Sequence, residues 1–242
     1  MAEKKEKVCI LGFAPSWREA PFADQSYEIW CLNEMYKVAK QVPAFRADRW
    51  FEIHDRNSKS KATPEHTAFL KQCPVPLYMW GHYDDIPNSV RFPKDEIMRW
   101  LESKVFYGSG YFNNSISWMV ALAMMEGFKH IAIYGVDMAT GDEWGHQKPS
   151  CEYFIGLAEG MGIKVEIPDS SELLKCAQLY GFESNNKLRA WMKAQTQEMG
   201  KRVQGIGQQA VQLQQNLTQA QIAQAQCQGA QQAYKEILKR TQ

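Results

Sequence analysis

Short apolar runs alternate with longer segments of mixed polarity along roughly the first 170 residues, and most runs end in small or polar residues. Runs of this length, rich in Ile, Val, Trp and Cys, are typical of strands that are buried on both faces of a sheet. The pattern predicts strands at 8–11, 29–33, 50–53, 75–80, 131–137 and 164–168.

The segments between these strands predict helices. One begins near Thr63-Pro64-Glu65, where proline suits the first helical turn. Residues 115–127 are apolar almost all round and close on a glycine, which indicates a buried helix, and a further helix covers about 151–161. Residues 87–104 are amphipathic but less regular and fit a lid or capping segment. Strands that alternate with helices predict an α/β fold with a Rossmann-like, mostly parallel sheet and flanking helices.

The composition changes near Gly181, and the chain then becomes rich in Gln and Ala with no strand signal. Apolar residues follow alternating steps of four and three, which is the heptad spacing of a coiled-coil seam. The seam positions are Met199, Val203, Ile206, Ala210, Leu213, Leu217, Ala220, Cys227, Tyr234 and Leu238, and the two positions that break the pattern, 224 and 231, are both Gln. We expect a catalytic domain over 1–180 and a helical tail over 181–242 that associates with a second copy, with a break near Gly205 as one possible feature. The alternative is a long helix that packs on its own domain.

Charge and cysteine content narrow the class of protein. The formal net charge is +1. The segment from Lys187 onward has eight basic and two acidic residues, whereas the chain before Lys187 has an excess of acidic residues. The six cysteines are scattered without a CxxC pair, so we expect reduced core thiols and no zinc site. Neither a signal sequence nor an apolar run of about 18 residues is present, and the sequence therefore predicts a cytoplasmic protein with no membrane contact.

Three strand ends carry residues suited to a ligand site. The first strand ends in Gly12-Phe13-Ala14-Pro15-Ser16, the second in Asn33, and the one near 131–137 in Asp137. In open α/β sheets the ligand lies in the crevice outside the carboxyl ends of the strands, so these residues are expected to face one site. The small-residue turn offers backbone N–H groups and a hydroxyl to a phosphate, although an ordinary strand-to-helix turn and a helix cap are the simpler interpretations.

Three further segments carry candidate chemistry. Residues 107–115 include Ser109 and Gly110 and precede the buried helix, where they can approach a ligand or simply cap that helix. The loop 137–150 brings His146 and Lys148 to the same crevice, as a candidate base and a partner for phosphate. His54-Asp55-Arg56 ends the third strand and offers a second histidine. The remaining histidines, His66, His82 and His130, are expected to be surface or structural residues.

The order of these motifs resembles the bacterial lipooligosaccharide sialyltransferases. The chain carries G-x-A-P-S after its first strand, C-L-N-E at the second, G-S-G before the buried helix, I-x-I-Y-G-V-D, G-H-Q-K and I-P-D-S-S-E-L-L. The family carries the comparable succession G-N-G-P-S, C-N-Q, S-G, a strand ending in G-I-D, G-H-S-K and P-N-S-L-L. The resemblance extends roughly from Val8 to Leu174 and omits the C-terminal helix.

The resemblance implies a Rossmann-like, metal-independent glycosyltransferase whose donor is a nucleotide-sugar and which needs no other cofactor. His146 would be the catalytic base, and Lys148 is a candidate to stabilise the leaving phosphate. The residues implied to hold the nucleotide are Gly12, Pro15, Ser16, Asn33, Ser109, Gly110, Asp137, Pro168 and Ser170. Phe13 and Ala14 stand where the family has Asn and Gly. Between the matching strand and histidine, the family has a long lid whose tyrosines stabilise the departing phosphate. Here only eight residues, none of them Tyr, separate Asp137 from His146.

Other functions remain open at this point. A pterin diphosphokinase-like enzyme would use ATP and Mg²⁺ held by carboxylates, for which Asp137, Asp142 and Glu143 are candidates. A non-catalytic nucleotide-binding protein is the third alternative. The acceptor is a glycan or, given the basic tail, a modified phage nucleobase.

Overall fold

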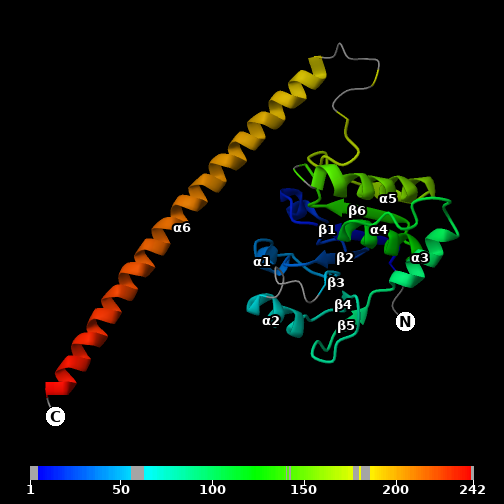
Figure 1. Cartoon of the computed structure of the whole chain (residues 1–242). Helices are drawn as coiled ribbons and strands as arrows, with labels where there is room; N and C mark the ends of the chain where they lie inside the picture. The colour runs from blue at the N-terminus through cyan, green and yellow to red at the C-terminus, as the bar shows by residue number, and fades with distance from the viewer. Residues whose placement is uncertain are drawn as a thin grey trace. The chain divides into compact units, whose positions relative to one another are not determined.

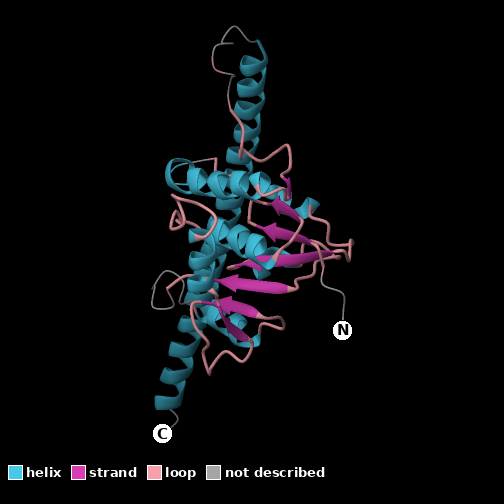
Figure 2. Ribbon diagram, turned by 90° about the vertical axis from the view of Figure 1, so that its right-hand side faces the viewer, coloured by secondary structure: helices cyan, strands magenta, loops and turns pink. Residues whose placement is uncertain are grey.

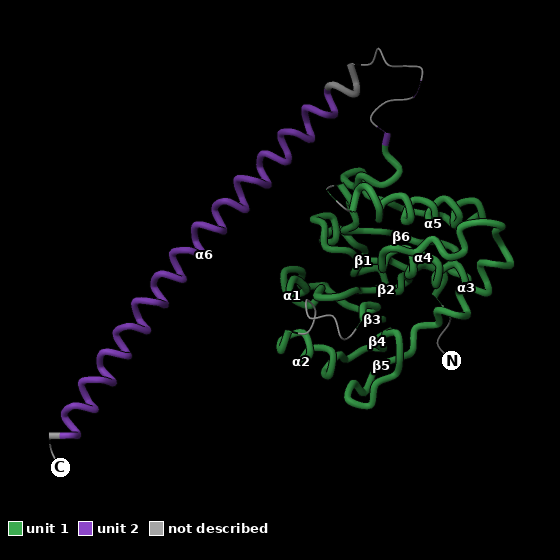
Figure 3. The backbone as a smooth tube through the Cα atoms, in the orientation of Figure 1, with its two compact units in different colours: residues 1–175 green, residues 176–242 purple. Residues whose placement is uncertain are grey.

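The computed structural model describes residues 5–55, 63–139, 141, 143–176, 180 and 186–240, the last segment with backbone alone at 186–189 and 240. The expected sites Arg56 and Asp142 lie outside the described residues. The chain divides into two compact units, Met1–Lys175 and Cys176–Gln242, which are coloured separately in Figure 3.

Unit 1 is built on a seven-stranded sheet whose strands all run parallel, which confirms the predicted α/β class (Figure 2). The strands are β1 (Lys7–Leu11), β2 (Tyr27–Leu32), β3 (Arg49–Glu52), β4 (Leu77–Met79), β5 (Ser89–Arg91), β6 (His130–Tyr134) and β7 (Lys164–Glu166). Their order is β5-β4-β3-β2-β1-β6-β7. The chain therefore reverses its direction of travel across the sheet between β1 and β6, which is the topological switch point where α/β proteins bind ligands.

Helical segments connect the strands (Figure 1). They are η1 (Pro15–Glu19), α1 (Tyr36–Ala39), α2 (Pro64–Gln72), α3 (Lys94–Glu102), α4 (Ser115–Glu126), η2 (Glu143–Gln147) and α5 (Lys148–Gly160). Residues 87–104, expected to be irregular, instead form β5 and α3. β5 escaped prediction because three residues with only Ser89 buried carry no alternating pattern. α3 places Ile97 and Leu101 in the core, so it covers the sheet and is not a lid.

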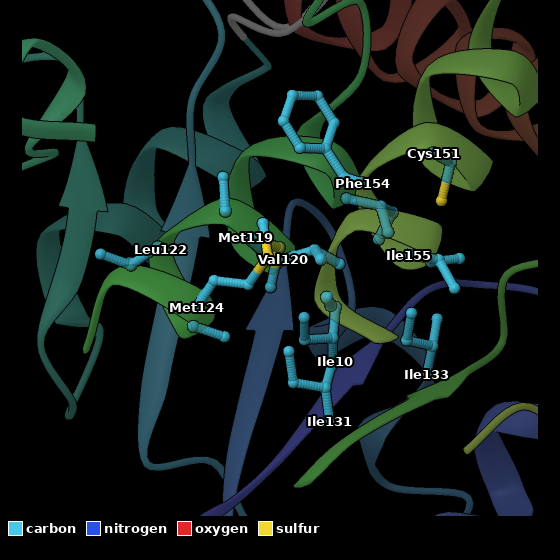
Figure 4. Packing of buried hydrophobic residues seen from close by; sticks show 14 of the residues in the cluster. Ile10, Met119, Val120, Leu122, Met124, Ile131, Ile133, Cys151, Phe154 and Ile155 are labelled. Atoms are coloured by element: carbon cyan, nitrogen blue, oxygen red, sulfur yellow. The ribbon is translucent and has the colours of Figure 1, made fainter. Parts of the chain in front are cut away.

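The two faces of the sheet are covered separately, because successive side chains on a strand point to opposite sides. On one face Ile10, Ile131 and Ile133 pack with apolar residues of α4 and α5, as Figure 4 shows. Apolar residues of α3 belong to the same cluster. On the other face Cys9 and Leu11 pack with residues from η1, α2 and the start of α1. Burial on both faces explains why these strands are apolar throughout.

Helix α4 has clear signals at both ends. The side chain of Asn114 accepts a hydrogen bond from the backbone N–H of Ser117 at 2.8 Å, and Gly127 ends the helix in the left-handed conformation with φ of 84°. Its residues from Met119 to Ala123 are fully buried, as the all-round apolar pattern predicted. The two caps therefore define where α4 begins and ends.

Unit 2 contains α6 (Asn186–Arg240), a continuous helix of 55 residues. The helix runs through Gly205 without the break that its glycine content suggested. Its apolar side chains are exposed, among them Val203 at 68%, Leu213 at 67% and Leu217 at 51%. Across the described part of the chain, no helix combines the length and hydrophobicity that crossing a membrane requires.

Candidate functional site

A pocket of about 480 Å³ lies at the carboxyl ends of β1, β2, β3 and β6. The residues that line it are Gly12, Phe13, Ala14, Leu32, Asn33, Ile53, His54, Phe112, Asn113, Asn114, Ser115, Ile116, Trp118, Gly135, Val136, Asp137, Met138, Glu143 and Gln147. Its volume falls in the range of small-molecule sites, and its position at the switch point is the one that sheet topology favours for a ligand.

The floor between β1 and β6 is a close contact of two backbones. The Gly12 N–H donates to Tyr134 O at 2.8 Å, and the Ala14 N–H donates to Gly135 O at 2.8 Å. A β-carbon on Gly12 would lie 2.2 Å from Gly135 O, and Gly135 itself has a positive φ of 70°. Both positions therefore require glycine, and the pocket has a flat backbone surface at this point.

Asn33 follows β2 in a left-handed backbone conformation, with φ of 49°. Its N–H donates to Phe51 O, and its O accepts from the indole N–H of Trp50, each at 2.9 Å. The side-chain Oδ1 is buried and has no hydrogen-bond partner among the described residues. A buried acceptor without a partner is costly in a protein, which marks Asn33, on the lining of the pocket, as a candidate for contact with a ligand.

Two asparagines connect the start of α4 to η2. Asn113 Nδ2 donates to His146 O, and Asn114 Nδ2 donates to Gln147 O at 3.0 Å. These bonds hold the C-terminal end of η2 against the start of α4, and both Glu143 and Gln147 line the pocket. The loop that the sequence predicted over the crevice is thus held there by side chains of the neighbouring helix start.

Aromatic rings form one wall. Phe112 stacks on Trp118 with ring centroids 3.5 Å apart and on Phe154 with centroids 4.3 Å apart. Phe13, on the turn after β1, also lines the pocket and is 46% exposed. The faces of Phe112 are covered by Trp118 and Phe154, whereas the exposed Phe13 ring offers flat apolar surface to a nucleobase or a sugar face.

The charged and titratable residues on the described lining are His54, Asp137 and Glu143, and none of the described lining residues is Lys or Arg. His54 is held by Glu52, a buried carboxylate that the sequence pattern does not single out. Glu52 is the last residue of the short strand β3 and follows large side chains. Its contacts with His54 and His66 are visible only in the tertiary structure. Among the residues described here, no group of three or more His, Cys, Asp or Glu side chains is arranged to hold a metal ion.

The predicted site residues separate into two groups. Gly12, Asn33 and Asp137 line the pocket together. Ser16 does not line it, because its buried Oγ accepts a hydrogen bond from Gly135 N at 2.8 Å and so supports the turn from beneath. The lining does not include Pro15, Ser109, Gly110, Pro168 or Ser170. Near Ser170 it is Ser171 that is buried, donating from Oγ to Val136 O at 2.6 Å.

His146 and Lys148 lie beside the pocket. His146 is exposed in η2, and its side chain is not part of the lining. Lys148 is buried at the start of α5, with Nζ 3.7 Å from Glu152 Oε1 and 5.9 Å from the Trp144 ring centroid. In this arrangement Lys148 is turned to its own helix, and its predicted contact with phosphate stays a prediction.

Comparison with known proteins finds similarity in structure alone. No protein-family model matches the chain, and no curated protein sequence matches it. Among solved structures, the chain is similar to the Campylobacter jejuni sialyltransferase CstII in complex with cytidine-5′-monophosphate, at 16% identity over 76% of this chain and 92% of that one, with a TM-score of 0.49. CstII with CMP-3FNeuAc matches at 18% identity over 74% and 91%, with a TM-score of 0.48.

The monofunctional α-2,3-sialyltransferase Cst-I of the same organism matches at 14% identity over 83% of this chain and 97% of that one, with a TM-score of 0.40. These proteins belong to the same class of enzymes that the sequence motifs resemble. At such low identity the similarity concerns the fold.

Proposed function

We propose that this protein is a glycosyltransferase that moves a sugar from a nucleotide-sugar to an acceptor hydroxyl, with the donor in the pocket at the carboxyl ends of β1, β2, β3 and β6. The observation that carries the proposal is Asn33, a polar residue in a strained backbone conformation whose buried Oδ1 has no partner among the described residues. Strained, over-determined residues with unmet hydrogen-bonding capacity are characteristic of ligand sites.

Other features of the pocket fit a nucleotide. The glycine turn after β1 lets a ligand approach the backbone closely, and the beginning of α4 offers N–H groups to an anion. Phe13, which lines the pocket and is 46% exposed, provides apolar surface on which a base or sugar can lie. Four of the six motifs that resemble the sialyltransferases contribute a residue to the lining of the pocket: Gly12, Asn33, Asp137 and Gln147.

The charges on the lining favour a donor with a single phosphate. Asp137 and Glu143 are acidic, and the described lining holds no Lys or Arg to neutralise a diphosphate. A nucleoside monophosphate-sugar carries one phosphate charge and is less repelled than a nucleoside diphosphate-sugar. The donor class that these charges favour is therefore a nucleoside monophosphate-sugar. The resemblance of the motifs to the sialyltransferases supports a CMP-sugar as this donor and a glycan hydroxyl as the acceptor class.

A histidine beside the donor would take the proton of the acceptor. The two candidates are His54, which lines the pocket, and His146 in η2, whose end residues line it. Because imidazole accepts protons near neutral pH, either would match the task.

The test is a binding and turnover screen of the full chain. CMP-, UDP- and GDP-sugars and ATP are compared by thermal shift, since a ligand of the folded state raises the melting temperature. We expect stabilisation by CMP and release of CMP from CMP-sialic acid in the presence of EDTA. Turnover of ATP that requires Mg²⁺ would favour pyrophosphate transfer instead, and binding of a nucleotide-sugar without turnover would favour a non-catalytic binding protein.

We also propose that α6 associates with the same helix of a second copy. Within a single chain, more than half of the surface of Val203, Leu213 and Leu217 on its heptad stripe is exposed. Long helices with such a stripe are stable when they bury it against another helix. A seam that contains Ala and Gln is thin, and an equivalent partner matches it along its whole length.

A further inference from the structure

A buried carboxylate holds two histidines at the edge of the pocket. Glu52 ends β3 and is 4% exposed. Its Oε1 lies 2.8 Å from His54 Nδ1, and its Oε2 lies 2.9 Å from His66 Nε2. The carboxylate thus uses one oxygen for each ring.

The two histidines differ in what they can reach. His66, in the first turn of α2, is 2% exposed, and its ring stacks with those of Tyr36 and Phe69 at centroid distances of 5.9 and 6.5 Å. It is not on the lining of the pocket. His54 is on that lining, with its side chain 35% exposed. Of the pair, His54 alone is placed to touch a ligand.

Glu52 remains charged in this setting. Burial by itself raises the pKa of its carboxyl, but hydrogen bonds and charge from His54 and His66 outweigh burial and lower the pKa to about 2. An ionised carboxylate at Nδ1 keeps the proton on that nitrogen and leaves the lone pair on Nε2. The same arrangement orients the base in many hydrolytic sites.

We propose that His54 is the catalytic base of the transfer reaction and that Glu52 is the residue that positions it. This inference rests on the proposed glycosyltransferase function. His54 Nε2 takes the proton of the acceptor hydroxyl as the hydroxyl oxygen forms a bond to the anomeric carbon. The bond from that carbon to the phosphate oxygen breaks, and its electron pair leaves with the nucleotide. The His54 imidazolium that forms is stabilised by the Glu52 charge.

The sequence resemblance assigned this role to His146. In the structure His146 is exposed in η2, and its side chain does not line the pocket. His54 instead has its ring nitrogen bound to a buried carboxylate. A base must be held in one orientation to act in the transition state, and this condition is met at His54.

The experiment compares His54→Asn with His82→Asn in the full chain, with CMP-sialic acid as donor and lactose as acceptor. The Asn side chain places an amide N–H near the position of the imidazole Nδ1, so it can still donate to Glu52 but has no basic nitrogen. His82 is the matched control, because its Nδ1 also makes a hydrogen bond, to Ser89 O at 2.9 Å, away from the pocket. Circular dichroism and CMP affinity verify that each variant folds and binds.

We expect His54→Asn to lower kcat by about 10²-fold with KM for the donor nearly unchanged, and His82→Asn to remain near the wild-type rate. Glu52→Gln should also lower kcat with little effect on KM, since it removes the charge that orients the ring. Added imidazole should restore part of the rate to the His54→Ala variant, which has space for it. It should not restore the rate of Glu52→Gln, because the His54 ring is still present in that variant and occupies the same space.

The outcomes distinguish failure of the role proposed for His54 from failure of the proposed glycosyltransferase function. Wild-type transfer together with a His54→Asn variant within a few-fold of wild type would overturn the role of His54 and leave the glycosyltransferase function standing. If His54→Asn does not fold, the imidazole rescue of His54→Ala and the kcat of Glu52→Gln decide the question. A wild-type chain that binds CMP but turns over no nucleotide-sugar contradicts both proposals.

Discussion

A β-carbon on Gly12 would lie 2.2 Å from the carbonyl oxygen of Gly135, so the backbones of β1 and β6 meet beneath the pocket at a distance that only glycine allows. The contact is reciprocal, since a β-carbon on Gly135 would lie 2.4 Å from Gly12 O. It joins the two strands that flank the switch point. The shape of the pocket therefore depends on two residues that contribute no side chain.

Gly12→Ala is expected to lower the free energy of unfolding by about 2 kcal/mol or more, because the backbone must move to admit the new methyl group. It should also weaken CMP binding, since the floor of the pocket moves. The control is Gly156→Ala in α5, where a β-carbon has open space and the substitution should stabilise the helix by up to about 1 kcal/mol. Chemical denaturation and calorimetry measure both. Equal stability of the two variants would contradict the close contact.

Asn33→Gly should weaken nucleotide binding by about 1 kcal/mol or more without lowering stability, because it removes the side-chain acceptor and keeps the left-handed backbone. Asn33→Ala should lose both affinity and stability, as alanine is strained at this φ. Calorimetric titration with CMP and thermal melting distinguish the two effects. Unchanged affinity in Asn33→Gly would place the ligand elsewhere.

The Glu52 carboxylate should make stability depend on pH. Its pKa in the folded protein, about 2, lies below the ordinary value of 4.5, so its stabilising effect is complete above about pH 5 and is lost as pH falls toward 2. The effect is worth on the order of 3 kcal/mol. Glu52→Gln should flatten the loss of unfolding free energy between pH 5 and pH 3, measured in urea. Glu102→Gln, at an exposed carboxylate, should keep the wild-type dependence.

Removing residues 176–242 should leave a folded unit of lower oligomeric order, because both apolar clusters of the sheet consist of residues before Lys175. In the full chain, Leu213→Asp combined with Leu217→Asp should have the same effect by placing charge in the seam. Gln208→Asp combined with Gln215→Asp is the matched control off the seam. Light scattering reports the mass. A full chain that is already monomeric would contradict self-association.

The cysteines should differ sharply in reactivity. Burial raises the pKa of Cys9, Cys31 and Cys151, and it also raises that of Cys73, whereas Cys176 and Cys227 are exposed. We expect two of the six thiols to react quickly with Ellman's reagent in the native protein and all six after denaturation. Fast reaction of more than two would mean that the sheet opens readily.

Local pattern in the sequence was sufficient for most of the fold. The runs at β1, β2 and β6 are apolar throughout because both faces are covered, and the glycine and asparagine that bound α4 mark its ends chemically. Even the grouping of Gly12, Asn33 and Asp137 follows from the rule that parallel strands end at one edge. The heptad spacing of α6 likewise predicts a long helix without reference to any other element.

Tertiary structure alone decided the roles that depend on distant partners. The Ser16 hydroxyl looked available for a phosphate, but it is buried against Gly135, 119 residues along the chain. Glu52 looked like one polar position in a short strand, and its contact with two histidines forms only when α2 folds back to bring His66 to its second oxygen. The physical reason is that periodicity records which face of an element is buried, whereas a hydrogen bond between remote side chains leaves no periodic signal in the sequence.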